Sequence, residues 1–147
     1  MSKVDEFRDK FKDVISQEIE KKGRYYFNIT NENLRTIARY LFEEMGCRLS
    51  TATGTEMEDH LQIIYHFSHD KTGQYFCPRV VIKDKDNPQV DSIVPIVMGA
   101  KWIERELFDF WGIKFKDHPD MRRLLALNHP AKLDKPMRYK EEQYDQE

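Results

Sequence analysis

Three histidines that lie close together in the sequence, His60, His66 and His69, have side chains able to hold a metal ion. The alternation of apolar residues predicts a strand over 61–67, so His60 and His66 share one face of it. At about 3.3 Å per residue, the six positions between them correspond to about 20 Å. We place His69 in the turn that follows. A shared metal would need a sharp bend in this strand, so surface or half-buried histidines are the expected interpretation.

The two cysteines, Cys47 and Cys77, offer thiolate chemistry but have no Cys-x-x-Cys spacing. They cannot build a four-thiolate iron–sulfur or zinc site within this chain, and we expect reduced structural thiols. The sequence contains no glycine-rich phosphate loop, no Gly-x-Ser-x-Gly elbow and no His-Glu-x-x-His pair. An independent enzyme that uses His66 or a cysteine is therefore an alternative without a positive signal.

The densest cluster of aromatic and charged residues lies on a helix predicted over 100–111 and in the turn after it. Arg105 and Asp109 stand four positions apart and can pair on that helix. A core helix with a solvated charged face is the plainer interpretation. A helix this short in a small domain cannot bury two rings together with a charged network, however, and Trp, Phe and Arg are enriched at binding hot spots. We therefore expect a partner interface, made of Trp102, Glu104, Arg105, Glu106, Asp109, Phe110, Trp111, His118, Pro119, Arg122 and Arg123.

The composition is that of one folded domain. Of 147 residues, 39% are hydrophobic and 12% aromatic, which is enough for a core. The 24 Lys and Arg nearly balance the 26 Asp and Glu, so no global charge attracts nucleic acid or an anionic membrane. The N-terminus is charged where a signal peptide is apolar, and no run approaches the roughly 20 apolar residues of a membrane helix. Any membrane association is expected to come through partners.

Apolar periodicity and turn residues predict the elements that must position the cluster. They are a helix over 3–21 stopped by Gly23, a strand over 25–29, a helix from Thr30 or Asn31 to Met45 stopped by Gly46, a strand over 47–53 entering a turn at Gly54, a strand over 61–67, an antiparallel return over 75–83, a helix over 100–111 stopped by Gly112, an extended piece over 113–115 and a last short turn from His118 through Leu125. Phe42 is expected on the buried face of the second helix, and Pro78 at a bulge or sheet edge. Helices and strands in this order indicate an α+β two-layer domain, with a mixed, mostly antiparallel sheet packed against helices. We place this domain at 1–127 and an extended C-terminal arm at 128–147.

The segment that carries the cluster resembles the signature of the C-subunit family of NADH:quinone oxidoreductase (complex I) and of its counterpart in membrane-bound nickel–iron hydrogenases. The pattern is Trp-x-Glu-Arg-Glu-x-x-Asp, an aromatic with Gly-Ile/Val-x-Phe, and His-Pro-Asp-x-Arg-Arg-x-Leu. It is matched here by Trp102, Glu104, Arg105, Glu106, Asp109, Trp111, Gly112, Ile113, Phe115, His118, Pro119, Asp120, Arg122, Arg123 and Leu125. The stretches 92–95 and 64–67 are also similar to members of the family.

The resemblance implies a cofactor-free, non-catalytic subunit of a membrane-bound redox complex, peripheral on the cytoplasmic side of the membrane. It implies packing against the large subunit (the D-subunit of complex I or the hydrogenase large subunit), near the small subunit that holds the terminal iron–sulfur cluster. Partner subunits then carry iron–sulfur clusters and, in a hydrogenase, nickel–iron. The segments 128–130 and 135–139 echo the complex I elements only in part, which favours a ferredoxin-linked hydrogenase slightly over an NADH-linked complex. A stand-alone protein-binding module is the alternative.

Overall fold

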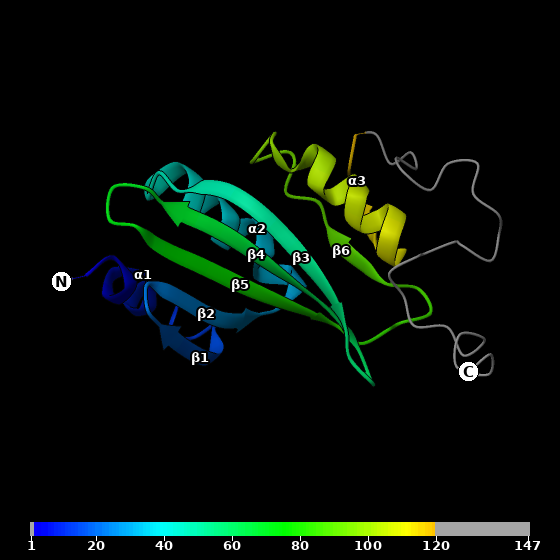
Figure 1. The fold of residues 1–147 in the computed structure, drawn as a ribbon, viewed down its shortest axis with the longest axis horizontal. Helices are drawn as coiled ribbons and strands as arrows, with labels where there is room; N and C mark the ends of the chain where they lie inside the picture. Colours follow the sequence, from blue (N-terminus) through cyan, green and yellow to red (C-terminus); the bar gives the residue numbers. More distant parts are fainter. Residues whose placement is uncertain (1, 120–147) are drawn as a thin grey trace.

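In the computed structural model, residues 2–119 are described, and they form a five-stranded sheet, a two-stranded sheet and the helices that pack on them (Figure 1). The elements are α1 (Lys3–Phe11), β1 (Ser16–Lys21), β2 (Arg24–Ile29), α2 (Asn31–Arg39) continued by the π-helical turn η1 (Tyr40–Glu44), β3 (Arg48–Glu56), β4 (Leu61–His69), β5 (Gln74–Ile82), β6 (Gln89–Asp91), α3 (Ala100–Trp111) and β7 (Lys114–Lys116). The expected α+β class is confirmed. The predicted short turn beyond Pro119 and the arm over 128–147 lie outside the described residues.

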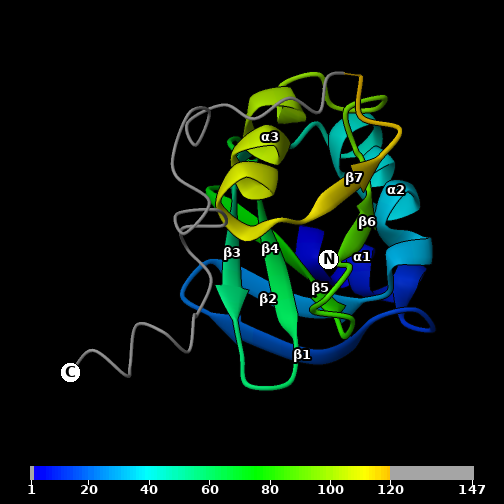
Figure 2. The same cartoon turned by 90° about the vertical axis from the view of Figure 1, so that its right-hand side faces the viewer.

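The main sheet has the strand order β1-β2-β5-β4-β3 and is mixed. Only β2 and β5 run parallel to each other, and the other neighbours are antiparallel. Figure 2 shows α1 and α2 on one side of this sheet, with α3 above strands β3 and β4. The core lies between helices and sheet, and its largest fully buried side chains include Phe7 of α1, Phe27 of β2 and Tyr65 of β4.

The predicted first helix over 3–21 is wrong in its second half. Helix α1 ends at Phe11, and residues from Ser16 form strand β1, which pairs antiparallel with β2. The cause is the turn that joins the two strands: Lys22 and Gly23 both have positive φ, 31° and 80°, as a two-residue hairpin requires. Gly23 therefore closes a hairpin instead of ending a helix, and Ile19, an apolar residue of the predicted helix, is 43% exposed on strand β1.

Three smaller expectations about single residues are also wrong. Phe42 is exposed, because η1 widens the helix after Arg39 and turns that side chain outward from the buried stripe. Gly54 lies inside β3, opposite Ile63, and the turn falls after Glu56. Pro78 lies in β5, an inner strand whose register with β4 is the same on both sides of it, so there is neither a bulge nor an edge. Strands β4 and β5 have no paired residues between the pair Ile64–Arg79 and the pair Phe67–Phe76. Pro78 lies in this gap and has no N–H to donate to a neighbouring strand.

The remaining elements follow the sequence pattern closely. Strands β2, β4 and β5 and helix α3 form where alternation and periodicity predict them, and Gly46 and Gly112 end their helices with φ of 70° and 75°. The extended piece expected over 113–115 is β7, which pairs in parallel with β6. This small sheet and the main sheet together hold α3 in place.

Candidate partner interface

The inward stripe of α3 contains a carboxyl group. Ala100, Glu104 and Leu107 lie at helical spacing and are all buried, and Glu104 has 0% exposure. Its Oε1 accepts a hydrogen bond from the Ser92 hydroxyl at 2.6 Å, and its Oε2 accepts one from the Ile93 N–H at 2.8 Å. The Ser92 hydroxyl oxygen accepts in turn from the Val94 N–H at 3.1 Å. Glu104 therefore fastens α3 to the turn after β6 and is not available to a partner.

Burial raises the pKa of Glu104 to about 7, against the hydrogen bonds from Ser92 and Ile93, which lower it. The negative charge of Glu104 in turn contributes to the raised pKa of Tyr65, for which burial is the main cause. The Tyr65 hydroxyl is buried and has no hydrogen-bond partner among the described residues. The contact region between α3 and the main sheet thus contains a titratable carboxyl and an unsatisfied hydroxyl.

The C-terminal end of α3 is seated on β3 by Trp111. A Cβ at Gly54 would lie 2.7 Å from Trp111 Nε1 and 2.8 Å from its Cδ1, so the indole rests directly on the glycine backbone. Glycine inside a strand often marks such a close approach. Sequence reasoning assigned Gly54 to a turn, and the signal it missed is a glycine inside a run with strand alternation.

The outward side of α3 presents a row of side chains to solvent. Trp102 is 57% exposed, Glu106 is exposed and Phe110 is half-buried, at successive four-residue steps that place them on one face. The Arg105 guanidinium lies 4.6 Å from the Trp102 ring centroid in a cation–π contact and is itself buried. Met98, two residues before the helix, is 84% exposed.

The eleven residues predicted as an interface therefore fall into groups that differ in their exposure to solvent. Trp102, Glu106 and Pro119 are exposed, and Phe110, Trp111 and His118 are half-buried. Glu104, Arg105 and Asp109 are buried within the chain, so the expectation that a domain of this size cannot shelter the charged network is wrong for them. The pairing of Arg105 with Asp109 stays a prediction, and Arg122 and Arg123 lie outside the described residues.

Two side chains, Arg35 and His118, make polar contacts that sequence reasoning missed and that hold this region together. Arg35 of α2 donates to the carbonyl oxygens of Ser92 at 2.8 Å and Lys116 at 3.0 Å, and it pairs with Asp117 at 3.2 Å. One side chain thus ties α2 to β6 and β7. His118 Nε2 lies 3.0 Å from the Lys101 carbonyl oxygen, which joins the chain after β7 to the start of α3. No local pattern marks Arg35, because its partners are far away in the sequence.

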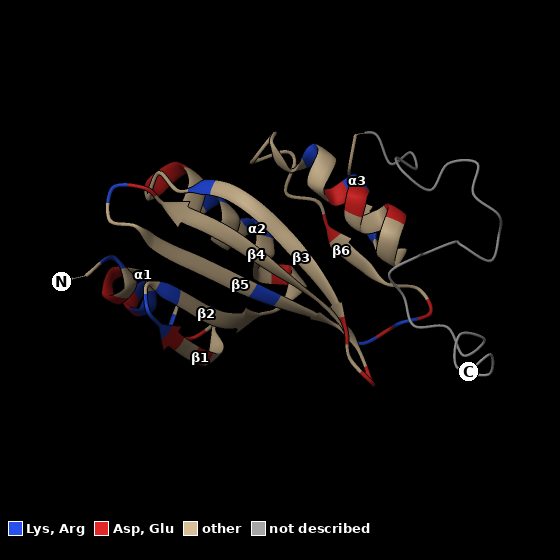
Figure 3. Ribbon diagram, in the orientation of Figure 1, with Lys and Arg blue, Asp and Glu red and all other residues tan. Residues whose placement is uncertain are grey.

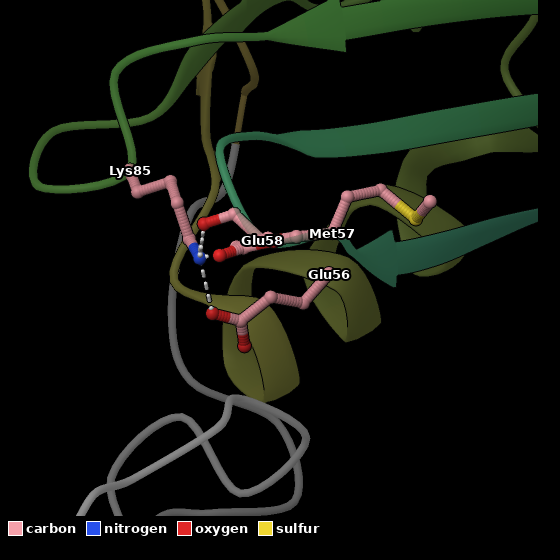
Figure 4. A pocket seen from close by; sticks show the side chains of 4 residues that line it. All are labelled: Glu56, Met57, Glu58 and Lys85. Atoms are coloured by element: carbon pink, nitrogen blue, oxygen red, sulfur yellow. Dashed lines mark hydrogen bonds and ion pairs between the residues drawn. The ribbon is translucent and has the colours of Figure 1, made fainter.

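A hollow of about 530 Å³ lies beside the β3–β4 turn and is lined by Glu56, Met57, Glu58 and Lys85. Figure 4 shows Lys85 reaching across it: Nζ lies 2.8 Å from the Glu56 carboxylate and donates to the carbonyl oxygens of Met57 and Glu58. The ammonium group is thus engaged with the turn. This arrangement fixes the loop after β5 to the β3–β4 turn and leaves Lys85 no evident role as a base.

Across the described residues, the histidines and cysteines do not come together as a catalytic or metal site. His69 is the last residue of β4 and is buried, with Nδ1 2.7 Å from Thr72 Oγ1, so the expected place in the turn is wrong. Cys77 Sγ lies 3.7 Å from His66 Nδ1, but burial raises the pKa of this thiol to about 11, and burial lowers the pKa of His66. A neutral thiol in the interior is a poor nucleophile. Both cysteines are free and buried, as expected of structural thiols.

Among residues 2–119, no group of three or more His, Cys, Asp or Glu side chains is arranged to hold a metal ion. Within the same part of the chain, no helix is both long and apolar enough to cross a membrane.

Comparison with known proteins agrees with the fold. Residues 27–147 match the family described as "Respiratory-chain NADH dehydrogenase, 30 Kd subunit". The chain is 30% identical over 146 residues to the C-subunit of NADH-quinone oxidoreductase from Paramagnetospirillum magneticum, covering 92% of this chain and 72% of the relative.

Two solved structures share the fold. One belongs to the membrane-bound sulfane sulfur reductase, an archaeal respiratory membrane complex, with a TM-score of 0.77 and 20% identity over 97% of this chain and 86% of that one. The other is a trypsin-resistant fragment of Nqo5, with a TM-score of 0.65 and 20% identity over 80% of this chain and 95% of that one.

This α+β domain is a subunit of a multi-subunit, complex I-like redox complex. The chain belongs to the 30 Kd subunit family of the respiratory-chain NADH dehydrogenases, whose curated members include the C-subunit of NADH-quinone oxidoreductase. The family resemblance carried by the 102–125 signature is confirmed.

Proposed function

We propose that this chain is a cofactor-free structural subunit of the water-exposed arm of its complex, peripheral on the cytoplasmic side of the membrane. The partners are the large subunit and the small subunit that carries an iron–sulfur cluster. Its role is positional: it holds the large subunit so that electrons reach the buried site along a rigid, dry path.

The observation that carries this proposal is the outward row of α3. Trp102 is a large ring exposed on a helix whose other sides are fixed to the fold by Glu104 and Trp111. An exposed tryptophan that is held by a cation–π contact with Arg105 offers apolar area that a partner can bury at low entropic cost. Family membership supplies the partner class, because the curated relative is named as one subunit of a larger oxidoreductase.

The test is affinity purification from native membranes with a tagged chain carrying Trp102→Ala. Loss of a hot-spot ring weakens binding by at least about 2 kcal/mol, so recovery of the large subunit should fall about thirtyfold under limiting conditions. Met57→Ala is the matched control, since Met57 is also an exposed apolar side chain but lies in the β3–β4 turn. Equal recovery of the large subunit with both variants would count against α3 as the docking helix.

For the kind of complex, we propose a ferredoxin-linked hydrogenase rather than an NADH-linked enzyme. The support is the departure of residues 128–139 from the complex I pattern. Sequencing the co-purified large subunit decides it. Two Cys-x-x-Cys pairs would provide a nickel site, and their absence would contradict the hydrogenase assignment.

A further inference from the structure

The main sheet has a second face, turned away from α1 and α2. Side chains alternate across a strand, and residues opposite each other in the register point to the same side. Phe27, Ile63 and Phe76 point to the helices, so their strand neighbours point away. These outward residues, here called the open face, are Ser16, Ile19 and Lys21 of β1, Arg24, Tyr26 and Asn28 of β2, Tyr75, Cys77, Arg79 and Val81 of β5, Gln62, Ile64, His66 and Ser68 of β4, and Arg48, Thr51, Thr53 and Thr55 of β3. Of these, Cys77 and Ser68 are buried by their neighbours.

The charges of the open face are all positive. Its strand residues include Lys21, Arg24 and Arg79 and no Asp or Glu. In Figure 3, β4 carries no charged residue and β5 a single blue band at Arg79. The acidic residues of β1 lie on the other side, where Glu18 and Glu20 pair with Arg8 of α1 at 2.7 and 3.5 Å.

The carboxylate in the turn after β4 does not neutralise this face. Asp70 is engaged by Arg48 at 3.3 Å and accepts from the Ser68 hydroxyl at 2.6 Å.

The centre of the open face holds polar atoms without partners. Arg79 and Asn28 are opposite each other on β5 and β2, and both are half-buried. Arg79 Nε and Asn28 Oδ1 are buried and lack a hydrogen bond among the described residues, while the Asn28 amide group donates to Gln17. Native proteins rarely leave such atoms unsatisfied. A guanidinium whose Nε lacks a partner is suited to a carboxylate, which it can bind through two parallel hydrogen bonds after a change of rotamer.

The shape and residue types of the open face suit a protein. Five strands about 4.8 Å apart, each with six residues of about 3.3 Å, give the sheet face a projected area of about 500 Å². The side chains that project from this face add accessible surface, so its total area approaches the ~800 Å² that each partner buries in a standard interface. Tyr26, Tyr75, Ile64 and Val81 stand between the cations. A phosphate-rich surface would call for a denser set of cations than this.

We propose that the open face is a second docking surface, and that its occupant is an acidic face of another subunit of the same complex. Carboxylates of that subunit meet Arg79, Arg24 and Lys21, and its apolar side chains pack on the tyrosines. This inference rests on the proposed function, since it places the chain in a complex. It adds that the chain is an adapter, with α3 contacting one neighbour and the open face contacting another.

The experiment uses the tagged chain purified within its native complex in about 0.1 M salt. With Arg24→Glu and Arg79→Glu combined, we expect recovery of one subunit to fall at least tenfold. Arg39→Glu is the matched control: it reverses an exposed arginine at the end of α2, away from the open face, and should change recovery less than twofold. If every subunit were recovered in full with the double variant while Trp102→Ala disrupted the complex, the adapter role of the open face would be overturned. The proposed function would then still stand. A wild-type chain that purifies alone would overturn both.

A second measurement on the wild-type complex does not depend on how the variants fold. Carbodiimide crosslinking should join Lys21 to an Asp or Glu of a partner subunit. If Lys21 were crosslinked only to this chain's own acidic residues 141–147, the occupant would be that segment and not another subunit. If the free chain bound vesicles with 30% phosphatidylserine and the double variant did not, the occupant would be a membrane. Either result would overturn the proposal of a protein partner.

Discussion

The carboxyl group of Glu104 should make the stability of this domain depend on pH in an unusual direction. Glu104 has no exposure and accepts hydrogen bonds from Ser92 and Ile93, and burial raises its pKa from 4.5 to about 7. In the unfolded chain the carboxyl ionises near its ordinary pKa. Because the folded pKa is the higher one, the folded state binds this proton more tightly, and ionisation favours unfolding.

The magnitude follows from the two pKa values. The contribution of Glu104 is fully present below about pH 4.5 and is lost as the pH rises through about 7. At about 1.4 kcal/mol per pH unit, the loss amounts to about 3 kcal/mol. Glu104→Gln removes the ionisation. It also replaces one of the two acceptor oxygens, which costs about 1 kcal/mol at every pH.

The assay is urea denaturation of the full chain and of the Glu104→Gln variant between pH 4 and pH 8. We expect the variant to be less stable by about 1 kcal/mol at pH 4 and more stable by about 2 kcal/mol at pH 8, with the curves crossing between pH 5 and pH 6. The difference between the unfolding free energies of the two proteins isolates Glu104, because all other titratable groups are common to both and cancel. Glu106→Gln, an exposed carboxyl on the same helix, should leave the curve unchanged. A difference between wild type and Glu104→Gln that does not vary with pH would refute the reasoning.

Three further substitutions probe how α3 and its supports are held. Gly54→Ala places a Cβ 2.7 Å from the Trp111 indole and should lower the free energy of unfolding by about 1–3 kcal/mol in urea denaturation. The control is Gly99→Ala, whose Cβ would meet no atom within 4 Å and should change stability by less than about 0.5 kcal/mol. Equal effects of the two substitutions would contradict the close contact. Tyr65→Phe removes a buried hydroxyl without a partner and should be neutral or stabilising by up to about 1 kcal/mol, so a clear loss of stability would reveal a hydrogen bond at that atom. Arg35→Ala breaks the contacts to Ser92, Lys116 and Asp117, so it should lower the free energy of unfolding by about 2 kcal/mol and speed amide hydrogen exchange in β6 and β7. Unchanged exchange in those strands would show that the small sheet does not need Arg35.

The sequence was sufficient where one local pattern dominated. Helix α3 spans the predicted Ala100–Trp111, because its apolar stripe and Gly112 indicate the same element. Strand β4 is recognisable because each alternate residue from Leu61 to Phe67 is apolar and buried. The family signature lies on one of these secure elements, so the class of protein could also be predicted.

The sequence was insufficient where the outcome depends on distant partners. The stretch Val14–Ile19 fits a helical stripe, but pairing with β2 and a hairpin turn at Lys22 make it a strand. Gly54 resembles a turn residue until Trp111, far away in sequence, is seen to lie on it. The burial of Glu104 depends on Ser92 and Ile93, which an isolated helix does not contain.

The signature of this family therefore mixes residues that are exposed on α3 with residues that hold the helix in the fold, and loss of the complex alone does not separate the two kinds. Trp102 and Glu104 are two positions apart, yet one is 57% exposed and the other 0%. Trp102→Ala removes surface, so the free chain should keep its stability to within about 0.5 kcal/mol while the complex weakens. Glu104→Ala leaves the Ile93 N–H without an acceptor, so the free chain itself should lose about 1–3 kcal/mol. If Trp102→Ala destabilised the free chain as much as Glu104→Ala did, the outward row would belong to the fold and not to an interface.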